Sequence, residues 1–201
     1  MKLETVRHTF TTWAPYYDAT HAWMLPYRRT ARLALGVQKR DRVLDLACGT
    51  GLSFAHLRRL VGPEGHITGV DLTPAMLDIA RARVVRRHWT NVDVREADAA
   101  KLPYSDASFG KALCAYAMNI IPDYTGAIAE AARVLAPGGR FVVLDVRMDS
   151  KTLPRWLHWM PHICAVDLGH QPIDALRCAF AKVVVHTYLA GACYVAVATK
   201  E

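Results

Sequence analysis

Three carboxylates and one glycine turn have the residue types and spacing to do chemistry. Asp45 lies in the apolar run 43–47, which leads into the glycine turn 49–51. Asp71 closes the next apolar run, and Asp98 closes the one after that. Glycines at such a turn let the backbone bend sharply and approach a bound ligand. The pattern therefore predicts a small-molecule site at the ends of consecutive strands.

The glycine turn excludes two common ligand classes. A dinucleotide fingerprint needs a third glycine where this chain has Phe54, and no Gly-Lys-Ser/Thr follows to cradle phosphates. A strand-end carboxylate such as Asp71 can accept hydrogen bonds from both hydroxyls of a ribose. Asp98 can accept from an adenine amine, with the backbone of Ala99 against the ring. The plainer interpretations remain open: Asp71 as a turn or N-cap residue, and Asp98 as a loop residue.

Alternating apolar and amphipathic segments predict an α/β fold in which these residues share one sheet edge. Residues 3–36 read as two helical pieces broken near Pro15 and Pro26. The predicted strands are 42–47, 66–71, 92–97, 110–115, 140–146, 181–188 and 193–199, the last two as an antiparallel pair. The predicted helices are 51–61, 74–88 and 123–135, with a short one near 172–178.

Bulk properties suit one globular domain. The chain has 201 residues, 52% of them hydrophobic, and its longest apolar stretch, 188–198, is too short to span a bilayer. No secretion signal precedes it, which predicts a cytoplasmic protein. Five cysteines without a Cys-x-x-Cys pair favour reduced thiols over a disulfide framework.

Positive charge gathers at the N-terminus. The net charge is +7, and residues 1–42 hold eight Lys or Arg against three acidic residues, together with six aromatic residues. This mixture suits a solvated helix with an aromatic packing face, or an anionic membrane surface contacted through residues 1–30. No nucleic-acid motif accompanies the charge, so nucleic acid is not an expected partner.

Together these motifs resemble the S-adenosylmethionine (SAM) site of class I methyltransferases, over about residues 10–199. Segments 13–18, 97–99, 102–103 and 133–139 look like those of the ubiquinone/menaquinone C-methyltransferase group. The resemblance implies a Rossmann-like, mostly parallel seven-stranded sheet with the last strand antiparallel and helices on both faces. It implies SAM as cofactor, S-adenosylhomocysteine as product, and cofactor contacts by Tyr17, Asp45, Ala47, Gly49, Thr50, Gly51, Asp71, Leu72, Met76, Asp98, Ala99 and Cys114. Asp45 would hold the SAM ammonium group directly or through water.

The methyl acceptor is inferred from the positions at which this sequence differs from that group. Met118 stands where the quinone enzymes have arginine, and 116–123 looks like a segment of bacterial phospholipid N-methyltransferases. The resemblance favours a phosphatidylethanolamine-type headgroup nitrogen, with the N-terminus docked peripherally at the inner membrane face. The alternatives are C- or O-methylation of a quinone-like or other small molecule, and an inactive SAM-binding interaction module. Tyr17, Tyr116 and His158 are the candidate catalytic residues, and Asp18 is another group able to take or orient a proton.

Within the single domain 1–201, residues 1–36 read as a substrate-facing or membrane-facing extension and 37–201 as the core. Segment 147–180 reads as a lid. It contains an unusual cluster whose members are Trp156, His158, Trp159, His162, Cys164, Asp167 and His170. A substrate lid is favoured over plain packing. Pro161 interrupts the helix that would align two histidines, so no metal is expected. The sequence leaves the oligomeric state open.

Overall fold

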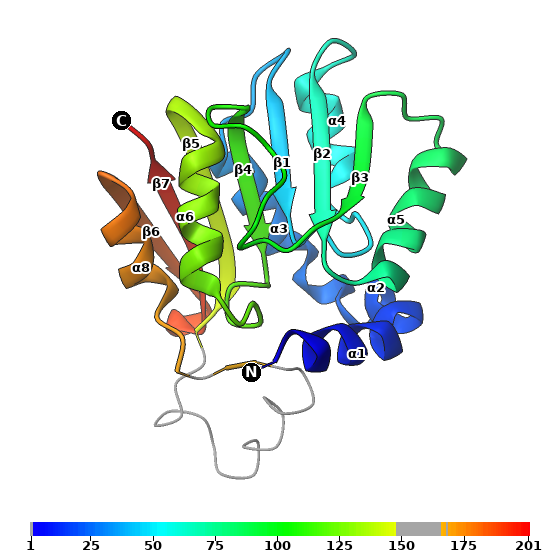
Figure 1. The fold of residues 1–201 in the computed structure, drawn as a ribbon, viewed down its shortest axis with the longest axis horizontal. Coiled ribbons are helices and arrows are strands. Elements are labelled where there is room, and N and C mark those ends of the chain that lie inside the picture. The colour runs from blue at the N-terminus through cyan, green and yellow to red at the C-terminus, as the bar shows by residue number, and fades with distance from the viewer. Residues whose placement is uncertain (1, 148–165, 168) are drawn as a thin grey trace.

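A seven-stranded sheet forms the middle of the molecule, with helices on both faces (Figure 1). The computed structural model describes residues 2–147, 166–167 and 169–201. The strand order is β3-β2-β1-β4-β5-β7-β6. The bounds are β1 Arg42–Leu46, β2 His66–Asp71, β3 Val92–Glu96, β4 Phe109–Ala115, β5 Leu135–Val146, β6 Lys182–Tyr188 and β7 Cys193–Thr199.

Strand direction follows the predicted fold class. β1 pairs in parallel with β2 and β4, β3 with β2, and β5 with β4. β7 runs antiparallel to both β5 and β6. The chain therefore reverses its direction of travel across the sheet between β1 and β4, and ligands of such sheets bind at that switch, beyond the carboxyl ends of the strands.

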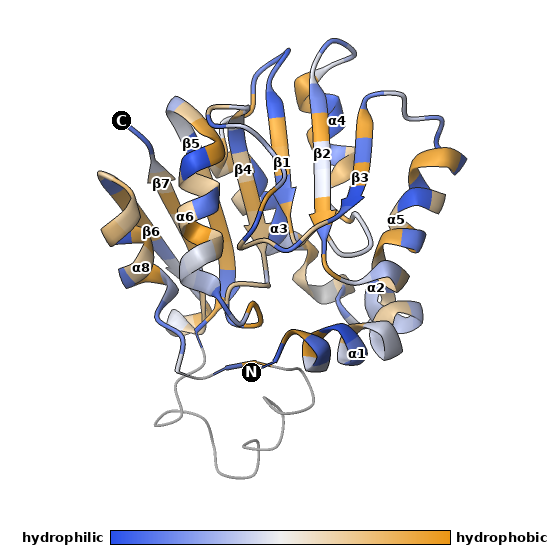
Figure 2. Ribbon diagram, in the orientation of Figure 1, coloured by the Kyte–Doolittle hydropathy of each residue, from blue (hydrophilic) through white to orange (hydrophobic). Residues whose placement is uncertain are grey.

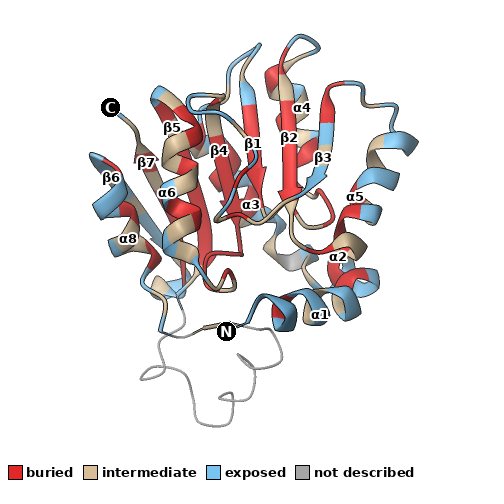
Figure 3. Cartoon of the chain, viewed as in Figure 1, coloured by how far each residue is buried: buried red, intermediate tan, exposed pale blue. Residues whose placement is uncertain are grey.

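Two apolar clusters hold helices against the sheet. One face carries α3 (Leu25–Ala34), α4 (Phe54–Val61) and α5 (Pro74–Arg86), whose buried members include Ala31, Phe54 and Leu77. The other face carries α6 (Tyr124–Val134) and α8 (Pro172–Ala179). Hydrophobic residues concentrate in the strands (Figure 2), and buried residues in the central ones, while β3 and β6 form more exposed edges (Figure 3).

The N-terminal segment crosses the carboxyl ends of the strands (Figure 1). It is built from α1 (Leu3–Trp13), the 3₁₀ turn η1 (Ala14–Tyr16), α2 (Tyr17–Thr20), the 3₁₀ turn η2 (Ala22–Met24) and α3. The break expected near Pro15 is η1, and Pro26 lies in the first turn of α3. Arg28 and Arg32 are buried, so two of the cations expected on a basic outer surface lie inside.

Two predicted boundaries were wrong for local reasons. β5 begins at Leu135 rather than 140, because Leu135 already pairs with Phe109 before the register shifts across the Pro-Gly-Gly segment. α4 begins at Phe54 rather than 51, because the glycine turn occupies the preceding residues. Among the helices formed by described residues, none combines the length and apolar character needed to cross a membrane.

Candidate active site

A pocket of about 680 Å³, with open solvent at its mouth included, lies where β1, β2, β3 and β4 end. Helix α1 closes one side of it with Leu3, Val6 and Phe10. Predicted site residues that line the pocket are Tyr17, Ala47, Gly49, Asp71, Leu72, Met76, Asp98, Ala99 and Tyr116. The three strand ends identified in the sequence thus meet at one cavity.

Asp71 ties the glycine turn to the following strand. Its Oδ2 accepts the Gly49 N–H at 2.8 Å, and its Oδ1 accepts the Thr73 N–H at 2.9 Å. Burial raises the pKa of the Asp71 carboxyl, and these backbone donors oppose the rise. The Thr73 side chain and the Leu72 N–H are further donors to this carboxylate. Asp71 therefore shapes the turn while forming part of the pocket wall.

The two glycines of the turn do different work. Gly49 has φ +56°, and a Cβ there would point toward the Tyr17 ring across the pocket. Gly51 has φ +76°, and a Cβ there would lie 2.5 Å from the Phe54 ring. Gly51 does not line the pocket; it makes room for Phe54, the residue that replaces the third glycine of a dinucleotide fold.

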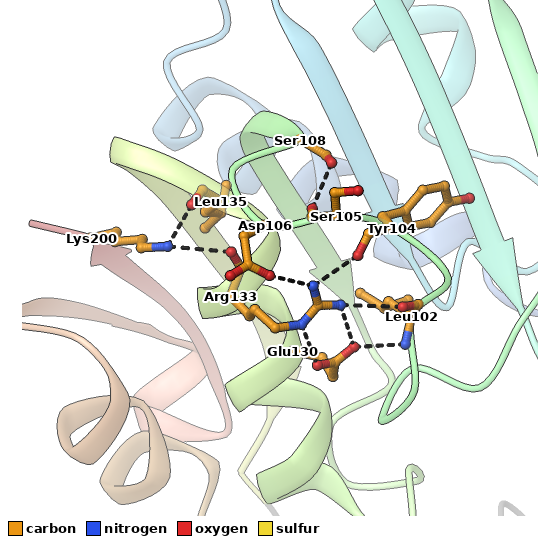
Figure 4. A network of polar contacts seen from close by, with 9 residues as sticks. All are labelled: Leu102, Tyr104, Ser105, Asp106, Ser108, Glu130, Arg133, Leu135 and Lys200. Carbon is orange, nitrogen blue, oxygen red and sulfur yellow. Dashed lines mark hydrogen bonds and ion pairs between the residues drawn. The ribbon is translucent and has the colours of Figure 1, made fainter.

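The wall of the pocket at Asp98 is a turn that α6 supports through side-chain hydrogen bonds. Asp98 Oδ1 accepts the Ala100 N–H at 2.9 Å, and the loop that follows is fixed by Arg133 of α6. Figure 4 shows the Arg133 guanidinium bonded to both carboxylate oxygens of Glu130, to Asp106, and to the Leu102 carbonyl. Glu130 in turn accepts the Leu102 N–H at 2.8 Å. This network joins the loop to the core beside the pocket.

Two pocket residues have backbone conformations that are unusual without glycine. Ala47 has φ +53° and Tyr116 has φ +63°, each directly after a strand. The left-handed region is costly for a bulky side chain, and such residues cluster at functional sites. The conformation directs Tyr116 into the space between the strand ends and the N-terminal segment.

Tyr17 and Tyr116 form a shared wall held by Arg28. The Arg28 Nη2 donates to the Tyr17 hydroxyl at 3.3 Å, and the guanidinium carbon lies 5.1 Å from the centre of the Tyr116 ring. Burial raises the pKa of both phenols. They therefore remain protonated near neutral pH and suit orienting and packing roles. The expectation that either would take a proton does not fit this environment.

A second, larger pocket of about 1080 Å³ adjoins the first. Its wall is mostly apolar and contains Thr9, Trp13, Met24, Val146 and Val166; Phe10, Tyr17, Tyr116 and Ile120 line both pockets. Its polar groups include His21, Asn119 and Asp145. Asp145 was missed in the sequence, although it closes the apolar run 140–146 in the way Asp71 closes 66–71.

Other predicted residues lie away from both pockets. Asp45 is 2% exposed, between the charges of Arg28 and Arg32, and burial raises its pKa to about 7. The sequence analysis identified no cationic partner for Asp45, whereas in the structure the charges of Arg28 and Arg32 act on it. Direct contact of Asp45 with the cofactor is not supported by this position, and a contact through water stays a prediction.

Thr50 and Cys114 also face elsewhere. The Thr50 hydroxyl donates to Asp18 of α2, and Asp18 also pairs with Arg83, so both residues anchor the N-terminal segment. Cys114 is fully buried within the sheet and is not part of either pocket wall. A cofactor contact by the Cys114 side chain is therefore not supported.

The expected catalytic residue His158 lies outside the described residues, as do Trp156, Trp159, His162 and Cys164. Of that cluster, Asp167 and His170 are described. The His170 ring stacks on Tyr124 with 4.3 Å between centres, and its Nδ1 bonds the Met118 carbonyl oxygen at 3.1 Å. His170 therefore packs against the core. Within the described ranges, no group of three His, Cys, Asp or Glu residues is arranged to hold a metal ion.

Residues 38–179 match the model of a family described as a methyltransferase domain. The chain belongs to this methyltransferase family. A demethylmenaquinone methyltransferase of Listeria monocytogenes serotype 4a (strain HCC23) is 31% identical over 160 residues, covering 77% of this chain and 67% of the relative. One of Deinococcus radiodurans is 38% identical over 149 residues, covering 72% and 61%. These relatives support the predicted likeness to the menaquinone group; neither is a phospholipid N-methyltransferase.

Solved structures agree on the fold of this methyltransferase. A Haloferax volcanii putative methyltransferase, in a complex with the Trm112 methyltransferase activator, superposes with a TM-score of 0.80 at 21% identity, covering 96% of both chains. A SAM-dependent methyltransferase from Aquifex aeolicus gives 0.64 at 19% identity, covering 86% of this chain and 89% of that one. The predicted Rossmann-like methyltransferase fold, the SAM cofactor and the enzyme class are confirmed.

Proposed function

We propose that this methyltransferase holds SAM in the first pocket and a hydroxylated, apolar aromatic ring of the demethylquinol class in the second. One observation carries the proposal: the two cavities share Phe10, Tyr17, Tyr116 and Ile120. A donor in one and an acceptor in the other would therefore meet at the two tyrosines. When bound, SAM supplies a methyl group on a sulfonium sulfur, and in-line displacement needs chiefly alignment and exclusion of water.

The residues of the first pocket fit SAM. Asp71 is half-buried at the pocket wall, and a carboxylate at this place can accept hydrogen bonds from a ribose diol. Asp98 has one oxygen engaged by its own turn, which leaves the other for an adenine amine. Gly49 leaves the space that a methionyl tail requires. The rings of Tyr17 and Tyr116 present π faces, which favour a sulfonium cation.

The second pocket favours a ring over a charged headgroup. Its wall is mainly apolar and aromatic, and the Listeria and Deinococcus relatives are named for demethylmenaquinone. Met118, the departure from the quinone pattern, is fully buried in the core and does not line the pocket, so it is no obstacle to such an acceptor. Arg28 and Arg32 face inward, which removes two of the cations expected to dock anionic lipid.

Methyl-labelled SAM provides the test. The protein is incubated in parallel with chemically reduced demethylmenaquinone and with vesicles of phosphatidylethanolamine. We expect label in the quinone fraction, and none there with the Asp71→Ala variant. Label in the lipid fraction alone would overturn the acceptor class. No label in either fraction, together with no SAM binding by calorimetry, would overturn the enzymatic role and favour the inactive binding module.

A further inference from the structure

Asp145 ends β5 at the wall of the second pocket, and it is the sole carboxylate among the described residues that line that pocket. Its side chain is fixed. Oδ1 accepts the Val146 N–H at 2.8 Å and Oδ2 accepts the Asn119 N–H at 3.2 Å. The Asn119 amide donates to the Val146 carbonyl at 2.7 Å, which locks the two chain segments together. The carboxylate thus has one orientation.

Burial makes ionisation of the Asp145 carboxyl group energetically unfavourable. It is 2% exposed beside an apolar cavity, and an ionised carboxylate in such surroundings is costly without compensation. The N–H groups of Val146 and Asn119 bond one oxygen each, and the Met118 N–H and the Asn119 side chain are further donors to the carboxylate. These donors hold it at the pocket wall, where it can meet a ligand.

We propose that Asp145 accepts the proton of the acceptor's ring hydroxyl and so activates the ring for methyl transfer. The inference rests on the proposed function, because it needs a hydroxylated acceptor in the second pocket. It gives the reaction a general base that the sequence left unidentified among tyrosines, Asp18 and histidines.

The electrostatic surroundings suit this role. Burial raises the pKa of Asp145 to about 6, against the opposing effect of the Val146 and Asn119 donors. The ionisable groups that couple to it are phenols and thiols whose pKa values are all raised, so they stay neutral where Asp145 ionises; they are Tyr17, Tyr116, Tyr194, Cys114 and Cys193. The charge of Arg28 acts on Tyr116 and that of Arg147 on Tyr194, two of these neighbouring groups. His21 also lines the pocket, with its pKa lowered by burial.

The proton and electrons balance without a further reactant. The hydroxyl O–H bond breaks, and its proton goes to Asp145. The electron pair left on oxygen moves through the ring to the carbon that bonds the methyl group, while the methyl–sulfur bond breaks and its pair stays on sulfur. The methylated carbon then loses its hydrogen as a proton to solvent, and Asp145 returns its proton to the oxygen. The net release is one proton.

The variant Asp145→Asn tests the inference, with Asp174→Asn as the matched control because Asp174 is an exposed residue of α8. We expect kcat with reduced demethylmenaquinone to fall about 100-fold in Asp145→Asn, the ordinary size of a general-base contribution. SAM affinity by calorimetry should change less than threefold. In the wild type, kcat/KM should fall tenfold per pH unit below pH 6, and this acidic limb should be absent in Asp145→Asn. His21→Phe should retain it.

A binding measurement gives a readout independent of turnover. 1-Naphthol is a hydroxylated ring, and Trp13 in the pocket wall can report its binding by fluorescence quenching. Wild-type affinity should weaken below pH 6, and Asp145→Asn should bind without that pH dependence. Transfer to the quinol within threefold of wild type, or an acidic limb that persists in Asp145→Asn, would overturn the role of Asp145 while leaving the proposed function standing. Failure of the wild type to methylate any quinol would overturn the function itself.

Discussion

The two pockets differ in how their walls are assembled along the chain. The first is built mainly from the ends of β1, β2, β3 and β4, so its polar groups lie just after apolar runs. The second joins residues of α1 and α2 to the ends of β4 and β5. The proposed donor site consists of consecutive strand ends and can be predicted from the sequence, whereas the proposed acceptor site joins distant segments and cannot. The difference also predicts that the two sites can be disabled separately.

The largest effect is expected at the donor side. Asp71→Ala removes the proposed ribose acceptor and the anchor of the Gly49 turn. SAM affinity should fall at least about 100-fold, which corresponds to about 2.7 kcal/mol. Isothermal calorimetry measures it, with Asp78→Ala, an exposed carboxylate on α5, as control. A loss smaller than about tenfold would show that Asp71 does not hold the ribose.

A second effect concerns the buried carboxyl group of Asp45 in β1. The pKa of Asp45 in the folded protein is about 7, above its ordinary 3.8, so the folded state binds the extra proton across this range. The free energy of unfolding should therefore fall as pH rises from about 4 to 7. Asp45→Asn cannot ionise, and should be more stable than wild type by up to about 4 kcal/mol at pH 8.

Thermal melting at several pH values measures this difference for the SAM-free protein. The gain from Asp45→Asn should shrink toward zero at pH 5, where the wild-type carboxyl is protonated. If the variant is instead less stable at every pH, the Arg28 and Arg32 charges outweigh burial and hold Asp45 ionised.

A smaller effect is expected from the support of the loop that follows Asp98. Arg133→Ala removes the guanidinium hydrogen bonds to Leu102, Tyr104 and Asp106 and leaves the bond between Leu102 and Glu130 (Figure 4). We expect a loss of about 1.5 kcal/mol, or about 3–6 °C in Tm. Arg177→Ala breaks an exposed ion pair and should cost under about 0.5 kcal/mol. Equal Tm values for the two variants would mean that the network contributes nothing beyond a surface ion pair.

Particular residues show which features of the fold and the site could be predicted from the sequence. Strand 66–71 and the parallel order followed from apolar runs ended by turns, and Gly49 with Asp71 followed from chemistry at those ends. Arg28 was counted as a surface cation, because helix charge alone does not reveal which face meets the sheet. Asp145 could be recognised as a pocket residue only from the fold, because its neighbours in the pocket come from α1, α2 and β4, far away in the chain.

One measurement tests most directly whether donor and acceptor occupy separate pockets. Thr9 on α1 lines the second pocket but not the first, whereas Thr12 on the same helix is exposed and lines neither. Thr9→Trp adds an indole to the acceptor space, and Thr12→Trp adds the same bulk outside it. SAM affinity and methyl transfer to reduced demethylmenaquinone are measured for both variants. The account predicts that Thr9→Trp loses transfer at least tenfold and keeps SAM affinity within threefold, while Thr12→Trp keeps both. Undiminished transfer by Thr9→Trp, or a parallel loss of SAM binding, would contradict it.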